Sequence, residues 1–193
     1  MTLEDILIRS ISGYVFVVPG LLLYDMYLKK SGKKQTSHRF ATTFLFCYYL
    51  IGILTMTGIG RIKPFAPTIV LIPFADMIKG PVDTVLNVIL FLPLGFFIPL
   101  LYREYERVGR TVSAGFFLSL AIELVQMFGR GTTDINDLIS NTVGTCLGHF
   151  FYRLFSGAIC KRTAEKFQAD KINGTIEMLL VTAYTFTIMI RCV

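Results

Sequence analysis

The stretch Ile122–Gly148, IELVQMFGRGTTDINDLISNTVGTCLG, decides the fold of this chain. It joins two apolar runs that are each long enough to cross a bilayer, which takes about 20 predominantly apolar residues. Because charged groups are costly inside a membrane, the stretch predicts a helical hairpin with a polar cluster near its turn. That cluster holds six polar side chains: Glu123, Gln126, Arg130, Asp134, Asp137 and Asn141.

The composition around this stretch is that of an integral membrane protein. Of 193 residues, 53% are hydrophobic and only 17% are charged, whereas soluble proteins carry about 25% charged residues. We therefore expect one membrane domain over residues 1–193. The net charge of +6 is spread over several loops, so we expect no nucleic-acid partner. The four cysteines show no metal-type spacing, and we predict no metal and no cofactor.

The apolar runs predict an all-α, polytopic transmembrane helical bundle of five or six spans. The last run is short and contains Glu177, so it either spans with tilt or thinning of the bilayer or lies along the interface. The predicted spans are Ile6–Leu28, Phe40–Ile59, Thr84–Leu101, Thr111–Phe128, Leu138–Phe155 and, as the short run, Ile176–Ile190.

The basic residues predict the orientation. Thirteen of the nineteen Lys and Arg residues fall in the segments 29–39, 102–110 and 153–171, and Lys and Arg accumulate on the cytoplasmic side of membrane proteins. The N-terminus and the polar cluster are therefore predicted to lie outside. Residues 60–81 then form an apolar extracytoplasmic loop, and residues 156–193 form a basic cytoplasmic linker followed by a C-terminal helix.

The spacing in the hairpin predicts how its two helices pack. Polar and small residues recur every three or four positions on both helices, which places them on one face of each. Small residues let membrane helices approach closely, so we predict that Ser119 faces Gly144 and that Gly115 faces Gly148. Nearer the turn, the same register pairs Glu123 with Asn141. It also pairs Gln126 with Asp137 and Arg130 with Asp134. The preceding helix adds Asn87 to the interior, Pro93 as a possible kink and Gly95 as a close contact.

The polar cluster is either a clasp that closes the hairpin or a binding site. Three carboxylates face one arginine, and this excess suggests a protonated Glu123, a bound cation, or a ligand that is cationic or donates hydrogen bonds. The catalytic residues, if there are any, stay unknown. The candidate ligand-binding residues are Asn87, Glu123, Gln126, Arg130, Asp134, Asp137 and Asn141.

The combined pattern resembles the VanZ-like family over residues 40–155, with GRGTTDINDLISNTVGTCLG as the most specific part. The residues that carry the resemblance are Asn87, Phe91, Pro93, Gly95, Glu123, Gln126, Arg130, Asp134, Asp137, Asn141, Gly144 and Gly148. The resemblance implies a multi-pass protein of the bacterial cytoplasmic membrane. It also implies an accessory role in glycopeptide resistance, giving low-level teicoplanin resistance.

Three functions are compatible with this pattern. A binding module would engage membrane lipids, a lipid-linked peptidoglycan precursor or a lipoglycopeptide antibiotic at the outer membrane surface. An intramembrane enzyme would use Glu123 and Asp137 for acid–base chemistry on an envelope lipid. A structural bundle would use the polar groups to hold its helices together, and a transport bundle would use them to line a route through the membrane. We favour the binding module, since no nucleophile with an adjacent histidine lies on the polar face.

Overall fold

The computed structural model describes residues 3–32, 36–58, 69–70, 72–74, 81–128, 133–158, 165–168 and 174–191. Most of the predicted loop 60–81 lies outside the described residues. So do Arg130 and much of the predicted cytoplasmic linker that begins at residue 156.

Almost all of the described chain is helical, which confirms the predicted all-α membrane bundle. The helices α1, α2, α4 and α5 are each long and apolar enough to cross a membrane. In chain order the elements are α1 (Leu3–Lys30), α2 (Ser37–Met56), β1 (Ile69–Val70), α4 (Pro81–Leu101), η1 (Arg103–Tyr105), α5 (Val108–Gln126), β2 (Thr133–Asp134), α6 (Ile135–Ala158), η2 (Glu165–Phe167) and α8 (Gly174–Arg191).

The helices α6 and α8 form where spans were predicted, but neither meets both requirements of length and apolarity. With 18 residues, α8 is about 27 Å long, slightly less than a hydrocarbon core of about 30 Å. The 24-residue α6 is long enough, but it buries polar side chains against its neighbours. That they cross the membrane stays a prediction. The buried polar residues of α6 are Asn136, Ser140, Asn141, Thr145 and His149.

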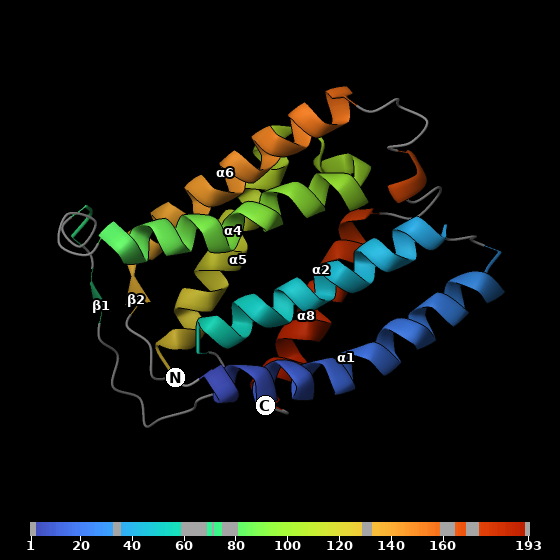
Figure 1. Ribbon diagram of the computed structural model, residues 1–193, viewed down its shortest axis with the longest axis horizontal. Helices are drawn as coiled ribbons and strands as arrows, with labels where there is room; N and C mark the ends of the chain where they lie inside the picture. Colours follow the sequence, from blue (N-terminus) through green and yellow to red (C-terminus); the bar gives the residue numbers. More distant parts are fainter. Residues whose placement is uncertain are drawn as a thin grey trace.

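Successive helices run in alternating directions through the bundle (Figure 1). At one end, α2 and α5 finish, α4 and α6 begin, and β1 pairs with β2 in parallel. We call this the strand end; α1 begins and α8 finishes there as well. The opposite end, called the basic end, holds most of the described cationic side chains: Lys29, Lys30, Arg39, Arg103, Arg107, Arg110, Arg153 and Lys166.

Glycines bring α4 and α6 into backbone contact. A Cβ added at Gly148 would lie 1.9 Å from the Leu92 carbonyl oxygen, and one added at Gly95 would lie 1.9 Å from the Thr145 carbonyl oxygen. At Gly144 the carbonyl oxygen of Val88 would lie 2.3 Å away. The prediction that Gly144 and Gly148 pack on α5 is therefore wrong. They face α4, because α6 lies against both helices and its small residues are turned toward α4.

Tyr49 of α2 bonds to the backbone of α4 on both sides of Pro93. Its hydroxyl donates to the Leu90 carbonyl at 2.5 Å and accepts from the Leu94 amide at 3.1 Å. A side chain inserted into the backbone ladder of a helix, together with a proline inside the helix, is a recognised cause of a local distortion. The Pro93 position is thus supported by a hydrogen bond from a neighbouring helix.

A buried ion pair attaches α8 to α2 at the basic end. The Arg39 guanidinium donates to the Glu177 carboxylate, and each residue is only 1% exposed. Removing one partner of such a pair leaves an uncompensated buried charge, which is strongly destabilising. The pair therefore holds α8 in the bundle, with Glu177 at the end that carries the basic loops.

Candidate functional site

Asn136 organises the strand end. Its backbone amide and its side-chain amide both donate to the Asp134 carboxylate at 2.8 Å. The side-chain amide also donates to the Ile72 carbonyl at 3.2 Å, and its oxygen accepts from the Phe74 amide at 2.6 Å. Phe74 has a φ of 66°, which a bulky residue rarely adopts. Asn136 thus holds a strained segment against the start of α6.

Glu123 is buried behind this segment and contacts backbone. It is 4% exposed, and its carboxylate accepts from the Asp134 amide at 2.9 Å. The Thr133 hydroxyl donates to the Glu123 carbonyl at 3.0 Å. Since a carboxylate that accepts a backbone N–H fixes that segment of chain, Glu123 positions β2 relative to α5.

A groove of about 820 Å³ opens beside these residues. We call it the strand-end groove. One part of its wall is apolar and comes mainly from α4, and the other part is polar and comes from α4, α5, β2 and α6. The apolar lining residues are Met56, Val70, Leu86, Ile89 and Leu90, and the polar ones are Thr57, Asp83, Thr84, Asn87, Gln126, Asp134, Asn136 and Asp137.

Two hydrogen bonds set the polar wall. The Asn87 amide donates to the Asp137 carboxylate at 2.6 Å and so links α4 to α6. The Gln126 amide donates to the Thr57 carbonyl at 2.9 Å, at the end of α2. The Gln126 side-chain oxygen is buried and has no hydrogen-bond partner among the described residues.

The described lining of the groove is acidic. Asp83, Asp134 and Asp137 contribute three carboxylates, and none of the described lining residues is basic. Carboxylates and amide oxygens accept hydrogen bonds from ammonium groups and from peptide or sugar N–H and O–H groups. The described residues include no group of three His, Cys, Asp or Glu side chains placed to bind a metal ion.

Below the groove, α5 and α6 pack through a different polar contact. The Asn141 amide donates to the Ser119 hydroxyl at 2.9 Å, and Gly115 lies against the Thr145 side chain. The predicted register paired these α5 residues with Gly144 and Gly148, three positions further along α6. The packing of α5 on α6 is therefore shifted by nearly one helical turn relative to that prediction.

The structure divides the predicted ligand-binding residues into two layers. Asn87, Gln126, Asp134 and Asp137 line the groove. Glu123 and Asn141 are not among the lining residues; they lie behind it and bond to β2 and to Ser119. Arg130 lies outside the described residues.

Sequence reasoning did not assign Asn136 and Asp83 to the site. Asp83 lies in the first turn of α4, where a carboxylate is already explained by its favourable interaction with the helix N-terminus. Asn136 falls between Asp134 and Asp137 but off the three- and four-residue spacing used to find the polar face. Its position two residues after Asp134, at a helix start, was the available signal, since Asp and Asn side chains at such places commonly bond to nearby backbone groups.

Comparison with known proteins gives two matches. The profile of the VanZ/LLP1 family matches residues 16–156, beginning inside α1. The "Protein VanZ" of Enterococcus faecium is 42% identical over 71 residues, which cover 35% of this chain and 42% of that protein. This chain thus aligns with less than half the length of that relative. No solved structure matches.

Proposed function

This chain belongs to the VanZ/LLP1 family, and from that premise we propose that it is a binding protein of a bacterial cytoplasmic membrane. In this proposal the strand end faces outward, as the distribution of Lys and Arg predicts. The strand-end groove then binds a lipid-linked peptidoglycan precursor or a lipoglycopeptide, and binding lowers susceptibility to teicoplanin-type antibiotics.

The observation that carries the proposal is the mixed apolar and acidic lining of the strand-end groove. Binding sites for small molecules are usually apolar concavities with a few well-placed polar groups. Here Leu86 and Ile89 contribute apolar lining, and Asp134 and Asp137 contribute carboxylates. Leu86 and Ile89 are 55% and 57% exposed, so the apolar wall is accessible to an acyl or polyprenyl chain.

The acidic side selects the polar part of the ligand. Lipid-linked precursors carry a peptide and sugars with many N–H and O–H donors, and a free amino group adds a positive charge. Asp137 accepts from Asn87 and Asp134 accepts from Asn136, and each carboxylate has about four acceptor positions. Teicoplanin-type lipoglycopeptides combine the same two features, an acyl chain and a polar peptide–sugar core.

A binding titration tests this proposal. The full chain in lipid nanodiscs is titrated with a fluorescent lipid-linked disaccharide–pentapeptide and, separately, with a fluorescent teicoplanin derivative. Asp137→Asn keeps an acceptor for Asn87 but removes the charge, and we expect it to weaken binding by about tenfold, as for the loss of one charge-assisted hydrogen bond. Asp25→Asn, which removes a carboxylate from α1 far from the groove, should bind like the wild type.

The same samples separate binding from catalysis. We expect the bound precursor to be recovered chemically unchanged after prolonged incubation. Conversion of the precursor by the wild type but not by Asp137→Asn would replace the binding proposal with the enzyme interpretation. If Asp137→Asn bound each probe with the same affinity as the wild type, a ligand site in the groove would be refuted.

A further inference from the structure

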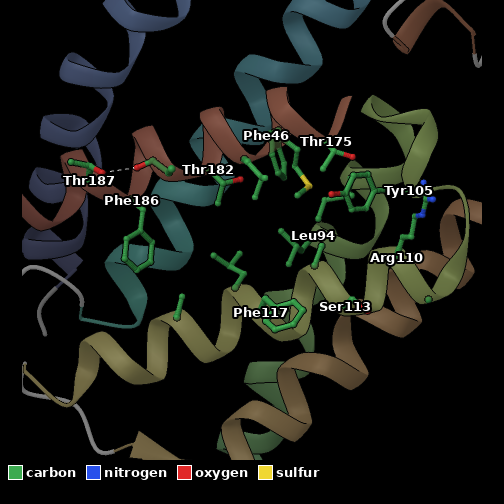
Figure 2. A pocket seen from close by; sticks show the side chains of 18 residues that line it. Phe46, Leu94, Tyr105, Arg110, Ser113, Phe117, Thr175, Thr182, Phe186 and Thr187 are labelled. Carbon is green, nitrogen blue, oxygen red and sulfur yellow. Dashed lines mark hydrogen bonds between the residues drawn. The ribbon is translucent and has the colours of Figure 1, made fainter. Parts of the chain in front are cut away.

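A second groove, also of about 820 Å³, lies between α5 and α8. We call it the α5–α8 groove. Figure 2 shows Phe117 of α5 and Phe186 of α8 on its two sides, with Phe46 of α2 and Leu94 of α4 behind them. None of the residues that line the strand-end groove takes part in it, so it needs an explanation of its own.

The described lining of the α5–α8 groove carries a charged side chain at one end only. Arg110, Tyr105 and Thr175 lie together at the basic end of the bundle, and Ala121 and Thr187 mark the other end. From Arg110 to Ala121 the α5 helix rises about 16 Å. That length equals about half of a hydrocarbon core of about 30 Å. The groove therefore extends through one leaflet only.

Arg110 places a positive charge at the mouth of the groove. Its side chain is exposed, and one of its guanidinium N–H groups donates to the Glu104 carbonyl at 3.2 Å. A guanidinium has five N–H donors and binds phosphate through two of them at once. The nearby Glu104 carboxylate accepts from the Gly174 amide at 3.1 Å, so it is engaged in holding the start of α8.

The size of the groove distinguishes a lipid chain from a protein helix. A helix with its side chains is about 10–12 Å across, so about 16 Å of helix would need more than about 1,200 Å³. The groove offers about 820 Å³. A single acyl chain is far thinner and enters from the membrane side, where Phe117 is 64% exposed.

We infer that the α5–α8 groove binds one acyl chain of an anionic phospholipid from the leaflet at the basic end, with the lipid phosphate on Arg110. Basic pockets between membrane helices on the cytoplasmic side are known to take anionic head groups. The other arginines of this loop, Arg103 and Arg107, increase the local concentration of anionic lipid without lining the groove.

Native mass spectrometry of the full chain in detergent tests this inference. The protein is titrated with phosphatidylglycerol or with phosphatidylcholine of the same acyl chains. We expect one phosphatidylglycerol to bind at roughly tenfold lower concentration than phosphatidylcholine, which is the effect of a charge-assisted hydrogen bond. Arg110→Gln should remove this preference, and the matched change Arg103→Gln should keep it.

Blocking the apolar part provides a second arm. Ala183→Phe, or Ser113→Phe if the first variant does not fold, fills the groove from an exposed lining position and should abolish the single bound lipid. Leu180 lies on α8, as Ala183 does, but does not line the groove. Leu180→Phe should therefore bind the lipid as the wild type does. The inference would be overturned if the wild type bound both lipids equally or if the filled variants kept the lipid. It would also be overturned if the wild type were a dimer and the filled variants were monomers.

Discussion

Asn136 connects residues 72–74 to the start of α6. It makes four hydrogen bonds, with Asp134, Ile72 and Phe74, while being only 3% exposed. The bond to Phe74 fixes a residue whose φ of 66° costs energy for a side chain of this size. The shape of the wall beside Asp134 and Asp137 therefore depends on a residue that carries no charge.

Replacing Asn136 should weaken this end of the molecule. Asn136→Ala removes the three side-chain hydrogen bonds of Asn136, to Asp134, Ile72 and Phe74, and we expect a loss of about 1–3 kcal/mol of stability. The measurement is the melting temperature in detergent, together with protease cleavage near residue 74. Thr142→Ala removes only a hydroxyl bond within α6 and should change little. An Asn136→Ala protein that melts like the wild type would contradict this role.

Glu123 should tolerate an amide but not truncation. Glu123→Gln keeps an oxygen that can accept from the Asp134 amide, so we expect a nearly unchanged melting temperature. Glu123→Ala leaves that partly buried amide without its partner and should cost about 1–3 kcal/mol. If Glu123→Gln were as destabilising as Glu123→Ala, the negative charge itself would be needed, and the backbone contact would not explain the residue.

At the scale of elements, the contact between α4 and α6 is the closest one described. Gly95, Gly144 and Gly148 each leave no room for a Cβ, because backbone atoms of the other helix lie within 2.3 Å of where it would be. This packing sets the distance between Asn87 on α4 and Asp137 on α6, whose side chains meet at 2.6 Å. The polar wall of the strand-end groove thus depends on glycines deeper in the bundle.

A single methyl group should separate these helices. Gly148→Ala would place a carbon 1.9 Å from the Leu92 carbonyl oxygen, and we expect a loss of about 1–3 kcal/mol or more from overpacking. Gly157→Ala on the same helix meets nothing within 4 Å and should be neutral or stabilising by up to about 1 kcal/mol. Thermal unfolding of both variants in one detergent gives the comparison. Equal melting temperatures would show that α4 and α6 are not in backbone contact.

The sequence predicted these helices and their small residues but not every partner. Spacing by three and four residues identifies one face of a helix, and that face is about 100° wide. On α6 this width contacts two neighbours, so Asn141 and Thr145 meet α5 while Gly144 and Gly148 meet α4. Periodicity cannot divide one face between two helices, which is why Gly148 was predicted to pack against Gly115.

For the whole molecule, the arrangement of the helices agrees with the charge distribution. The helix ends that line the strand-end groove and the segments that carry most of the described basic residues lie at opposite ends of the bundle (Figure 1). If Lys and Arg mark the cytoplasmic side, the groove opens outward. Contacts between residues far apart in sequence, such as Tyr49 with Leu90 and Arg39 with Glu177, complete the bundle and could not be predicted from local spacing.

Cysteine labelling tests the orientation. In a variant with the four native cysteines replaced by alanine, Thr132→Cys is predicted to react with a membrane-impermeant maleimide in intact cells. Glu106→Cys, at the basic end, should react only after the membrane is opened. Labelling of Glu106→Cys in intact cells would show that the topology is the opposite of the predicted one and that the strand-end groove faces the cytoplasm.

The strand-end groove itself was only partly predictable. Asn87, Gln126, Asp134 and Asp137 were found by spacing and by their polarity in an apolar context. The apolar wall from Leu86 to Leu90 was not, since apolar side chains on a membrane helix look alike whether they face lipid or a groove. Only the position of α4 relative to α2, β1 and α6 reveals that these side chains line a concave surface.

Site-specific photo-crosslinking tests the central claim most directly. A benzophenone amino acid replaces Leu86 on the apolar wall of the strand-end groove or, as the control, Leu147, which is 42% exposed on α6 outside the lining. Membranes are then irradiated with a radiolabelled lipid-linked disaccharide–pentapeptide. We predict labelling at position 86 that excess unlabelled precursor suppresses, and none above background at position 147. Equal labelling at both positions, or none at position 86, would contradict ligand binding in this groove.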